Sequence, residues 1–127
     1  MITIQTPLNP PDRDQQNLLS DRIRAELRRM HIPAHLRGYY YLTHILLQVV
    51  PNTGIPLFMT KNLYPDAGRT FGVSASSVER AIRTSISNCW NGKGRDALEQ
   101  MADYRLPQRP TSSQFIYIMA DYIRRTS

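Results

Sequence analysis

The chain has 127 residues and a formal net charge of +6, and hydrophobic residues make up 41% of it. This length supports one domain with a sizeable core, and this apolar content excludes a disordered chain. The single cysteine, Cys89, excludes an internal disulfide, and no basic-then-apolar leader opens the sequence. Residues 39–59 carry no Asp, Glu, Lys or Arg, but prolines and a glycine interrupt them, so no membrane span is predicted. We therefore expect a soluble, cytoplasmic protein.

The spacing of apolar residues predicts an all-α fold, a compact bundle of about six helices that contains a helix-turn-helix. Residues 1–11 hold three prolines and are predicted to form a flexible N-terminal arm, and residues 12–127 a single helical domain. The first helix is expected over residues 12–30. The second, over residues 38 to about 50, has no charged residue and is predicted to be the central core helix. Residues 51–56 are expected to form a turn or loop.

The second half of the chain is predicted to hold the remaining helices. Residues 57–71 are expected to be helical, with Pro65 in the first turn of a new helix. A long helix is expected over residues 75–90, ended by glycines, and a short one over residues 96–101. The last helix is expected from Thr111 to about residue 125, because Thr111 and Gln114 have capping-box spacing. Its predicted buried residues are Phe115, Ile118, Met119, Tyr122 and Ile123.

The positive charge is concentrated between residues 60 and 95. Arginine supplies fourteen of the sixteen basic residues of the chain, and arginine is favoured where phosphates or base edges are bound in a bidentate manner. A basic domain of this size favours an anionic partner, with nucleic acid as the first candidate. The segment contains two acidic residues, Asp66 and Glu79, against six basic ones: Lys61, Arg69, Arg80, Arg83, Lys93 and Arg95.

Residues 64–90 fit a helix-turn-helix. Gly68 is small where the two helices must approach closely, and Gly72 follows where the turn favours a positive φ. Val78 lies where the second helix packs back on the first. Ser74 is expected to cap the helix that begins at Ala75.

The helix over residues 75–90 has one apolar and one polar face. At 100° per residue, the apolar residues 81, 82, 86 and 89 lie within about 80° of Val78. A polar face of this kind suits the major groove, because Arg can bind guanine, Glu can accept from cytosine, and Ser can bind bases or phosphates. The same pattern also fits an ordinary surface helix in which Glu79 pairs with Arg83. The polar face comprises Ser76, Arg80, Arg83 and Ser87, and Glu79 lies at its border.

Four segments carry a more specific pattern: residues 32–39, Leu-Tyr-Pro-Asp at 63–66, Ser-Ser-Val-Glu-Arg-Ala-Ile-Arg at 76–83, and residues 109–115. In this order they resemble the DNA-binding C-terminal effector domain of the master sporulation response regulator of endospore-forming bacteria, the stage 0 sporulation protein A family. The likeness extends from about Leu18 to Arg125. It implies a six-helix fold whose third and fourth helices form the helix-turn-helix, and transcriptional control through a DNA box with a GTCGA-like core.

The resemblance also implies which residues contact DNA. Glu79, Arg80 and Arg83 match the residues that reach base edges in the family. The residues that match positions near phosphates are Thr60, Lys61, Ser74, Ser76 and Ser77. To these we add Ser87, Lys93 and Arg95 as further phosphate contacts. The expected partners are double-stranded DNA, a second copy as a homodimer or in tandem on DNA, and RNA polymerase, with no membrane and no small-molecule ligand.

The sequence departs from the family pattern at three positions. Neutral Ser77 and Thr70 stand where the family usually has basic residues, and Thr84 stands where it has histidine. Fewer phosphate contacts predict weaker and less salt-dependent binding. About seventeen residues precede the first match, too few for a phosphorylated receiver domain, so the chain is expected to be an excised domain or, as the start at Met1 favours, a free-standing relative.

No enzymatic site is predicted, and neither a cofactor nor a metal is expected. His31 and His35 are separated by Pro33, which prevents a regular helix from directing both at one metal. Cys89 has no evident base, and a metal nuclease would need more carboxylates than Asp66 and Glu79. The tyrosines at 39–41 and Trp90 are predicted to pack in the core. A second function remains open: a receiver-less protein-interaction module that antagonises or pairs with a full-length regulator without reading DNA.

Overall fold

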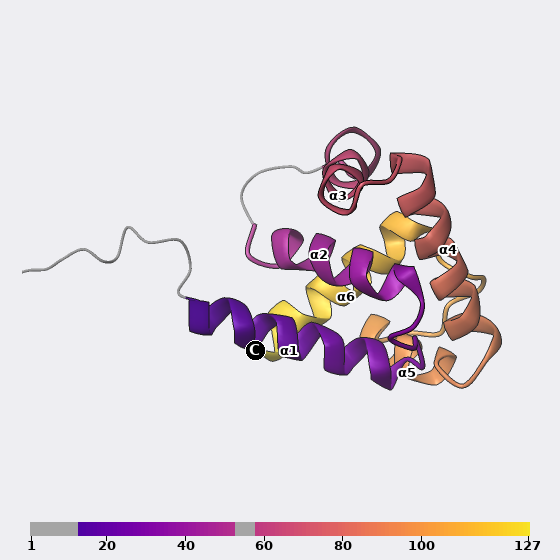
Figure 1. Cartoon of the computed structure of the whole chain (residues 1–127). Helices are drawn as coiled ribbons and strands as arrows, with labels where there is room; N and C mark the ends of the chain where they lie inside the picture. The colour runs from indigo at the N-terminus through magenta and orange to yellow at the C-terminus, as the bar shows by residue number, and fades with distance from the viewer. Residues whose placement is uncertain (1–12, 53–57) are drawn as a thin grey trace, which may run out of the picture.

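The computed structural model describes residues 13–52 and 58–127. This part of the chain holds six α-helices and a π-helical turn, and no strand, which confirms the all-α prediction (Figure 1). The expected arm, residues 1–11, and most of the expected loop, residues 53–57, lie outside the described residues. The elements in chain order are α1 (Arg13–Arg29), α2 (Arg37–Val49), η1 (Met59–Leu63), α3 (Tyr64–Phe71), α4 (Ala75–Asn91), α5 (Arg95–Ala102) and α6 (Ser112–Thr126).

The predicted helix ends agree with the structure to within about two residues, and local signals set several of them. Pro65 lies in the first turn of α3, where a missing N–H costs nothing. Thr111 and Gln114 form both hydrogen bonds of a capping box at the start of α6, with N–O distances of 3.1 and 2.9 Å. None of the helices among the described residues combines the length and the apolar composition needed to cross a membrane.

Helix α2 lies at the centre of the bundle, as its charge-free sequence predicts. It contacts α1, α3, α4 and α6, and in Figure 1 it lies between α1 and α3 with α6 behind it. Leu42, Ile45 and Leu46 are fully buried. The crossing with α4 is close at Gly38, where an added Cβ would lie 2.6 Å from the carbonyl oxygen of Ala81 and collide with the Ser85 hydroxyl. Glycine at this position therefore sets the distance between α2 and α4.

The predicted core needs three corrections. Tyr39 and Tyr41 are buried, each 4% exposed, but Tyr40 is 49% exposed, because three successive helical residues point in directions about 100° apart. In α6, Ile118 and Tyr122 are half-buried, and Ile116 is fully buried instead. Trp90 packs against the core but is also only half-buried.

Polar side chains join α1 to the last two helices. Glu26 is 8% exposed and accepts from both Arg22 and Arg29 at 2.9 Å. Arg29 also donates to the hydroxyl of Tyr122 in α6 and to Gln100 in α5. Two arginines thus satisfy the buried carboxylate, and one of them extends the network across three helices.

Candidate nucleic-acid interface

Helices α3 and α4 form a helix-turn-helix with each of the three predicted features. An added Cβ at Gly68 would lie 2.6 Å from the carbonyl oxygen of Val73, so only glycine lets the turn approach α3 this closely. Gly72 has φ of +72°, in the left-handed region that glycine adopts without strain. Val78 is fully buried. The two helices therefore have a fixed mutual position.

The start of α4 is capped by Ser74, as predicted. The Ser74 hydroxyl oxygen accepts from the backbone N–H of Ser77 at 3.0 Å, and the hydroxyl donates to the Ser77 side chain at 2.9 Å. Ser76 is exposed beside them. The first N–H groups of a helix lack partners within the helix, and α4 begins at an exposed end, where an anionic oxygen is favoured.

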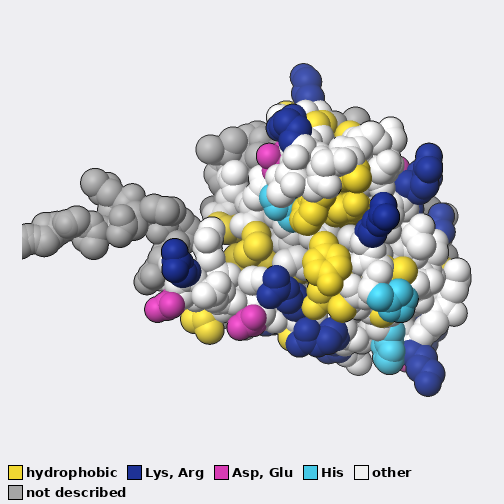
Figure 2. Space-filling model, viewed as in Figure 1, with side chains coloured by type: hydrophobic (Ala, Val, Ile, Leu, Met, Phe, Trp, Pro, Cys, Tyr) yellow, Lys and Arg dark blue, Asp and Glu magenta, His cyan; other side chains and the backbone are white. Residues whose placement is uncertain are grey.

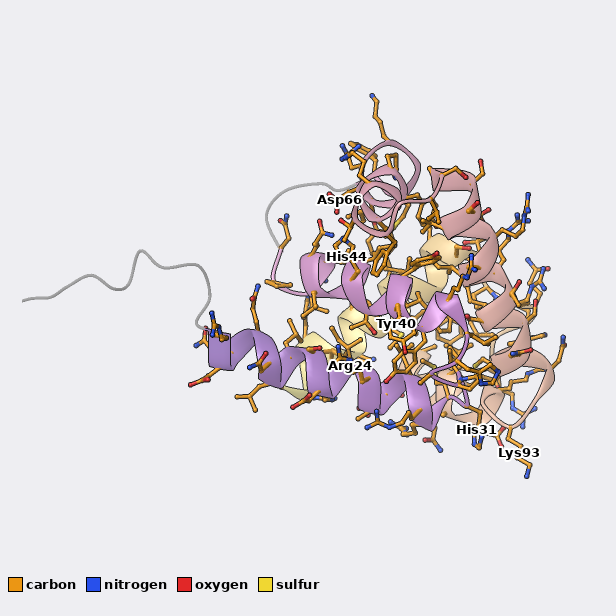
Figure 3. The ribbon with its side chains drawn as sticks, in the orientation of Figure 1. Arg24, His31, Tyr40, His44, Asp66 and Lys93 are labelled. Atoms are coloured by element: carbon orange, nitrogen blue, oxygen red, sulfur yellow. The ribbon has the colours of Figure 1, made fainter. Side chains whose placement is uncertain are left out.

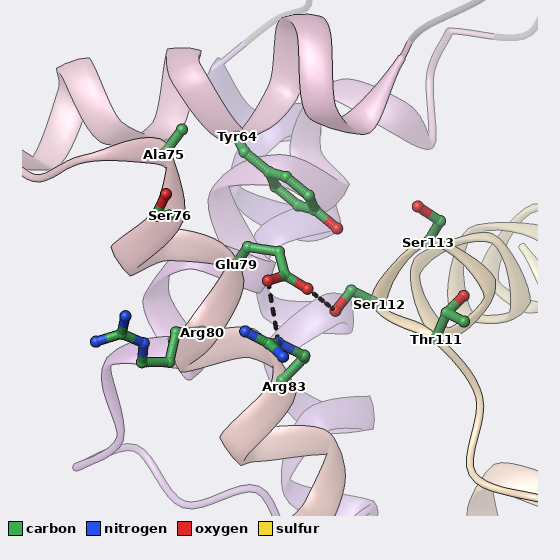
Figure 4. A pocket seen from close by; sticks show the side chains of 9 residues that line it. All are labelled: Tyr64, Ala75, Ser76, Glu79, Arg80, Arg83, Thr111, Ser112 and Ser113. Atoms are coloured by element: carbon green, nitrogen blue, oxygen red, sulfur yellow. Dashed lines mark hydrogen bonds and ion pairs between the residues drawn. The ribbon is translucent and has the colours of Figure 1, made fainter.

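The polar face of α4 borders a hollow of about 520 Å³. Figure 4 shows the hollow between the first turns of α4, the Tyr64 ring of α3 and the beginning of α6. Glu79, Arg80 and Arg83, the three residues predicted to reach base edges, line this hollow together with Ser76. The lining residues are Tyr64, Ala75, Ser76, Glu79, Arg80, Arg83, Thr111, Ser112 and Ser113.

Glu79 and Arg83 form an ion pair across this hollow. Arg83 Nε lies 3.0 Å from Glu79 Oε1, and the Ser112 hydroxyl donates to Glu79 Oε2 at 3.2 Å. The pair that an ordinary amphipathic helix would form is thus present. The Arg83 side chain is still 57% exposed, so part of its guanidinium faces solvent.

Arg80 differs from Arg83 in its partners. Among the described residues, no carboxylate lies within ion-pair distance of Arg80, and the side chain is exposed. Figure 4 shows it directed away from the Glu79–Arg83 pair. Arg80 is therefore the base-contacting candidate whose hydrogen-bonding capacity the fold leaves uncommitted.

The start of α6 and the start of α3 each contribute a residue that the sequence analysis did not assign to the site. Ser112 is 5% exposed and bonds Glu79, although 33 residues separate them. Tyr64 is 5% exposed, and burial raises the pKa of its hydroxyl, which therefore stays protonated and able to donate. The family-like segment at residues 109–115 was the one available signal for this neighbour of α4.

The predicted phosphate contacts fall into two groups. Lys61 is exposed on η1, near α3; the side chain of Thr60 lies outside the described residues. At the far end of α4, Lys93 is exposed and Arg95 begins α5. The 17 residues of α4 span about 25 Å, so the fold does not bring Lys93 and Arg95 to the hollow.

Besides Ser74 and Ser77, which bond each other, two more of the predicted phosphate contacts already have protein partners. The Ser87 hydroxyl is half-buried and accepts from Arg109 at 2.6 Å. The Arg95 guanidinium lies over the Trp90 ring, 3.8 Å from its centroid, and 4.0 Å from a Glu99 oxygen. A phosphate at either position would have to compete with these contacts.

The remaining reactive side chains do not assemble into another site. Cys89 is fully buried, and burial raises the pKa of its thiol to about 12, so the thiol stays protonated near neutral pH. Within the described residues, no group of three or more His, Cys, Asp or Glu is placed to hold a metal ion.

The comparison with protein families agrees with this geometry. Residues 23–123 match the family described as "Sporulation initiation factor Spo0A C terminal". The match begins at Ile23 in the second half of α1, includes the helix-turn-helix, and ends in α6 before its last turn. The chain therefore belongs to the Spo0A C-terminal family, the DNA-binding effector domains of sporulation regulators.

Proposed function

We propose that residues 12–127 form one domain that binds double-stranded DNA sequence-specifically and regulates transcription by placing the N-terminal half of α4 in the major groove. The observation that carries this proposal is the exposed face of Glu79, Arg80 and Arg83 on a helix held by a complete helix-turn-helix. A major groove about 12 Å wide admits one helix with its side chains. Among the described residues no element covers this face, which borders the hollow.

The proposed roles follow from the partners of each side chain. Arg80 is free to bind guanine O6 and N7 with both arms of its guanidinium. Glu79 holds the Nε side of Arg83, which orients the remaining guanidinium nitrogens and leaves acceptor capacity on the carboxylate for a cytosine amino group. Arg83 and Glu79 are thus proposed to act as a unit.

Phosphates are proposed to bind on both sides of this base-reading face. Ser76 and the N–H groups at the start of α4 are proposed to bind one strand, together with Ser74, Ser77, Thr60 and Lys61. Ser87, Lys93 and Arg95 are proposed to contact the backbone at the outer edge of the interface. The operator is proposed to contain a GTCGA-like core, bound by a homodimer or by tandem copies, with RNA polymerase as the regulated partner.

The test is fluorescence anisotropy with a GTCGA-containing duplex and a scrambled duplex, from low to physiological salt. The wild-type chain should prefer the core duplex at every salt concentration. Arg80→Ala and Arg83→Ala should each cost about 1–3 kcal/mol and relax the preference, whereas Lys61→Ala should weaken binding to both duplexes alike. Equal losses on both duplexes for the arginine variants would contradict base reading.

The second candidate function is a protein-interaction module that pairs with or antagonises a full-length regulator. It is favoured by three exposed positions where the family usually carries a basic residue or histidine. The hydroxyls of Thr70 and Thr84 bond back to carbonyl oxygens of their own helices at 3.1 Å, and Ser77 bonds Ser74. None of the three presents a charge. A charge reversal, Arg83→Glu, that abolishes DNA binding but leaves the cellular phenotype intact would favour this module.

A further inference from the structure

A second basic surface covers the junction of α1 and α2, outside the helix-turn-helix. It consists of Arg24 and Arg28 from α1 and Arg37 and Tyr40 from the first turn of α2, and all four side chains are exposed. We call it the α1–α2 arginine patch. Figure 2 shows dark blue Lys and Arg side chains around a hydrophobic patch on this face, and Figure 3 labels Arg24 and Tyr40 within it.

The arginines of this patch differ from their neighbours on α1 in their ion-pair partners. Arg22 and Arg29, on the same helix, both pair with Glu26 at 2.9 Å. Among the described residues, no carboxylate lies within ion-pair distance of Arg24, Arg28 or Arg37. The fold therefore uses two of the α1 arginines for its own stability and leaves the others in solvent.

Internal contacts hold the patch together. Arg24 and Arg28 are one turn apart on α1, and Arg28 donates to the Tyr39 hydroxyl at 3.3 Å. The Tyr39 ring lies edge-on to Tyr40, with 5.4 Å between centroids. Arg37 precedes Tyr40 by three residues on α2. The charges thus sit on two helices whose relative position is fixed, not on a flexible tail.

The patch is continuous with the proposed DNA-reading face. Arg37 and Arg80 line one hollow of about 310 Å³, on the opposite side of Arg80 from the hollow that contains Glu79. The close crossing of α2 and α4 at Gly38 fixes this neighbourhood. A series of arginines that have no ion-pair partner among the described residues therefore extends from Arg80 and Arg37 to Arg28 and Arg24.

We infer that the α1–α2 arginine patch binds the phosphate backbone of the duplex beyond the segment read by α4. This inference rests on the proposed function. The guanidinium group binds phosphate oxygens in a bidentate manner, and a row of arginines without carboxylates suits a polyanion. The patch would supply charged phosphate contacts, which the neutral residues Thr70 and Ser77 cannot supply.

An acidic protein segment is the competing occupant. The continuity with Arg80 favours DNA, because a duplex seated on α4 brings its flanking phosphates to the Arg37 side of the helix. Binding of an acidic segment to the α1–α2 arginine patch would not require the patch to be continuous with Arg80.

The experiment compares two duplexes of different length with the intact chain. One has about 12 base pairs and contains only the core, and the other has about 30 base pairs with the core at its centre. The test variant is Arg24→Gln/Arg28→Gln. The matched control is Arg13→Gln/Arg105→Gln, which removes two exposed arginines outside the patch; Arg13 lies about 16 Å along α1 from Arg24. Thermal melting should show both variants folded, because none of these side chains is buried.

Wild type and control should bind the long duplex more tightly and with a steeper salt dependence than the short one. The test variant should lose most of that difference, lowering the slope of log K against log salt by about 0.9 for each lost phosphate contact, and should bind the short duplex like wild type. Arg37→Gln should lower the affinity for both duplexes. The inference is overturned if the test variant matches the control on the long duplex, or if wild type shows no length dependence.

Two further outcomes separate the alternatives. Loss of binding to poly-glutamate by the test variant, with unchanged binding to the long duplex, would assign the patch to an acidic protein and overturn the inference. If wild type fails to prefer the core but the test variant still loses its length-dependent affinity, the proposed base reading fails while phosphate binding by the patch is supported.

Discussion

The two ends of α4 have opposite relations to the rest of the molecule. At the N-terminal end, Ser76, Arg80 and Arg83 are exposed beside an open hollow, and the backbone is held by a side-chain cap from Ser74. At the C-terminal end, Cys89 is fully buried, and Gly94 is packed against the end of α1 so closely that an added Cβ would collide with the carbonyl oxygen of Met30. One helix thus exposes its polar side chains at one end and is anchored at the other.

This difference shows how a small domain can present charged side chains rigidly. The polar side chains of the N-terminal end gain little from burial, because they face solvent. Its position is set by Gly68, Gly72 and Val78 at the turn and by the buried contacts further along the helix. Changes at the anchored end should therefore alter stability most, and changes at the exposed end should alter binding most.

The largest expected effect on stability is that of Gly94→Ala. Its Cβ would lie 2.6 Å from the Met30 carbonyl carbon and 2.9 Å from the Cys89 sulfur, contacts that require backbone movement. Overpacking of this kind costs about 1–3 kcal/mol of unfolding free energy. Urea denaturation measures the change, and the core-versus-scrambled preference of the folded protein should remain. The control is Gly72→Ala, where nothing lies within 4 Å and only the positive φ is strained, at about 1 kcal/mol. A smaller effect at Gly94 than at Gly72 would contradict the anchoring role.

Removal of the N-cap should have an intermediate effect. Ser74→Ala deletes the acceptor for the Ser77 N–H, and loss of such a cap costs about 1 kcal/mol. The matched control is Ser76→Ala, which changes an exposed neighbour. Its free energy of unfolding should stay within about 0.5 kcal/mol of wild type. If the two variants are equally stable, the cap does not hold this end of the helix.

Local signals in the sequence were sufficient for the helices and for the turn. Pro65, Ser74 and Thr111 determine helix starts through their own backbone geometry or side chains, so neighbours within four residues decide the outcome. Gly72 was predictable for the same reason, since the turn itself demands a positive φ. The angular arrangement of α4 likewise separated its buried face from its polar one.

Contacts between distant segments were not predictable in this way. Periodicity places Arg83 on the polar face, but it does not show that Ser112 binds its partner Glu79. The close approaches at Gly38 and Gly94 depend on where α4 crosses other segments. Tyr40 was misassigned because its apolar neighbours suggested core packing, while burial depends on the helices that surround α2.

The smallest expected effect concerns the polar contact that attaches α3 to α2. Helix α3 in turn packs against α4. The Asp66 carboxylate lies 3.0 Å from His44 Nε2 and accepts from Gln48 at 2.9 Å, which joins α3 to α2. The hydrogen bond from His44, followed by that from Gln48, lowers the pKa of Asp66 below its ordinary value. A carboxyl group with a lowered pKa in the folded state contributes stability above its unfolded pKa and loses it as the pH falls through its folded pKa.

Asp66→Asn should therefore be slightly less stable than wild type at pH 7, by less than about 1 kcal/mol because the carboxylate is 38% exposed. The difference should shrink as the pH falls below about 4, where the wild-type carboxylate becomes protonated in the unfolded and then in the folded state. Urea midpoints of both proteins between pH 7 and pH 3 measure this convergence. A difference that stays constant over the range would show that the charge of Asp66 does not hold α3 on α2, and that the exposed end of α4 depends on apolar packing and the turn alone.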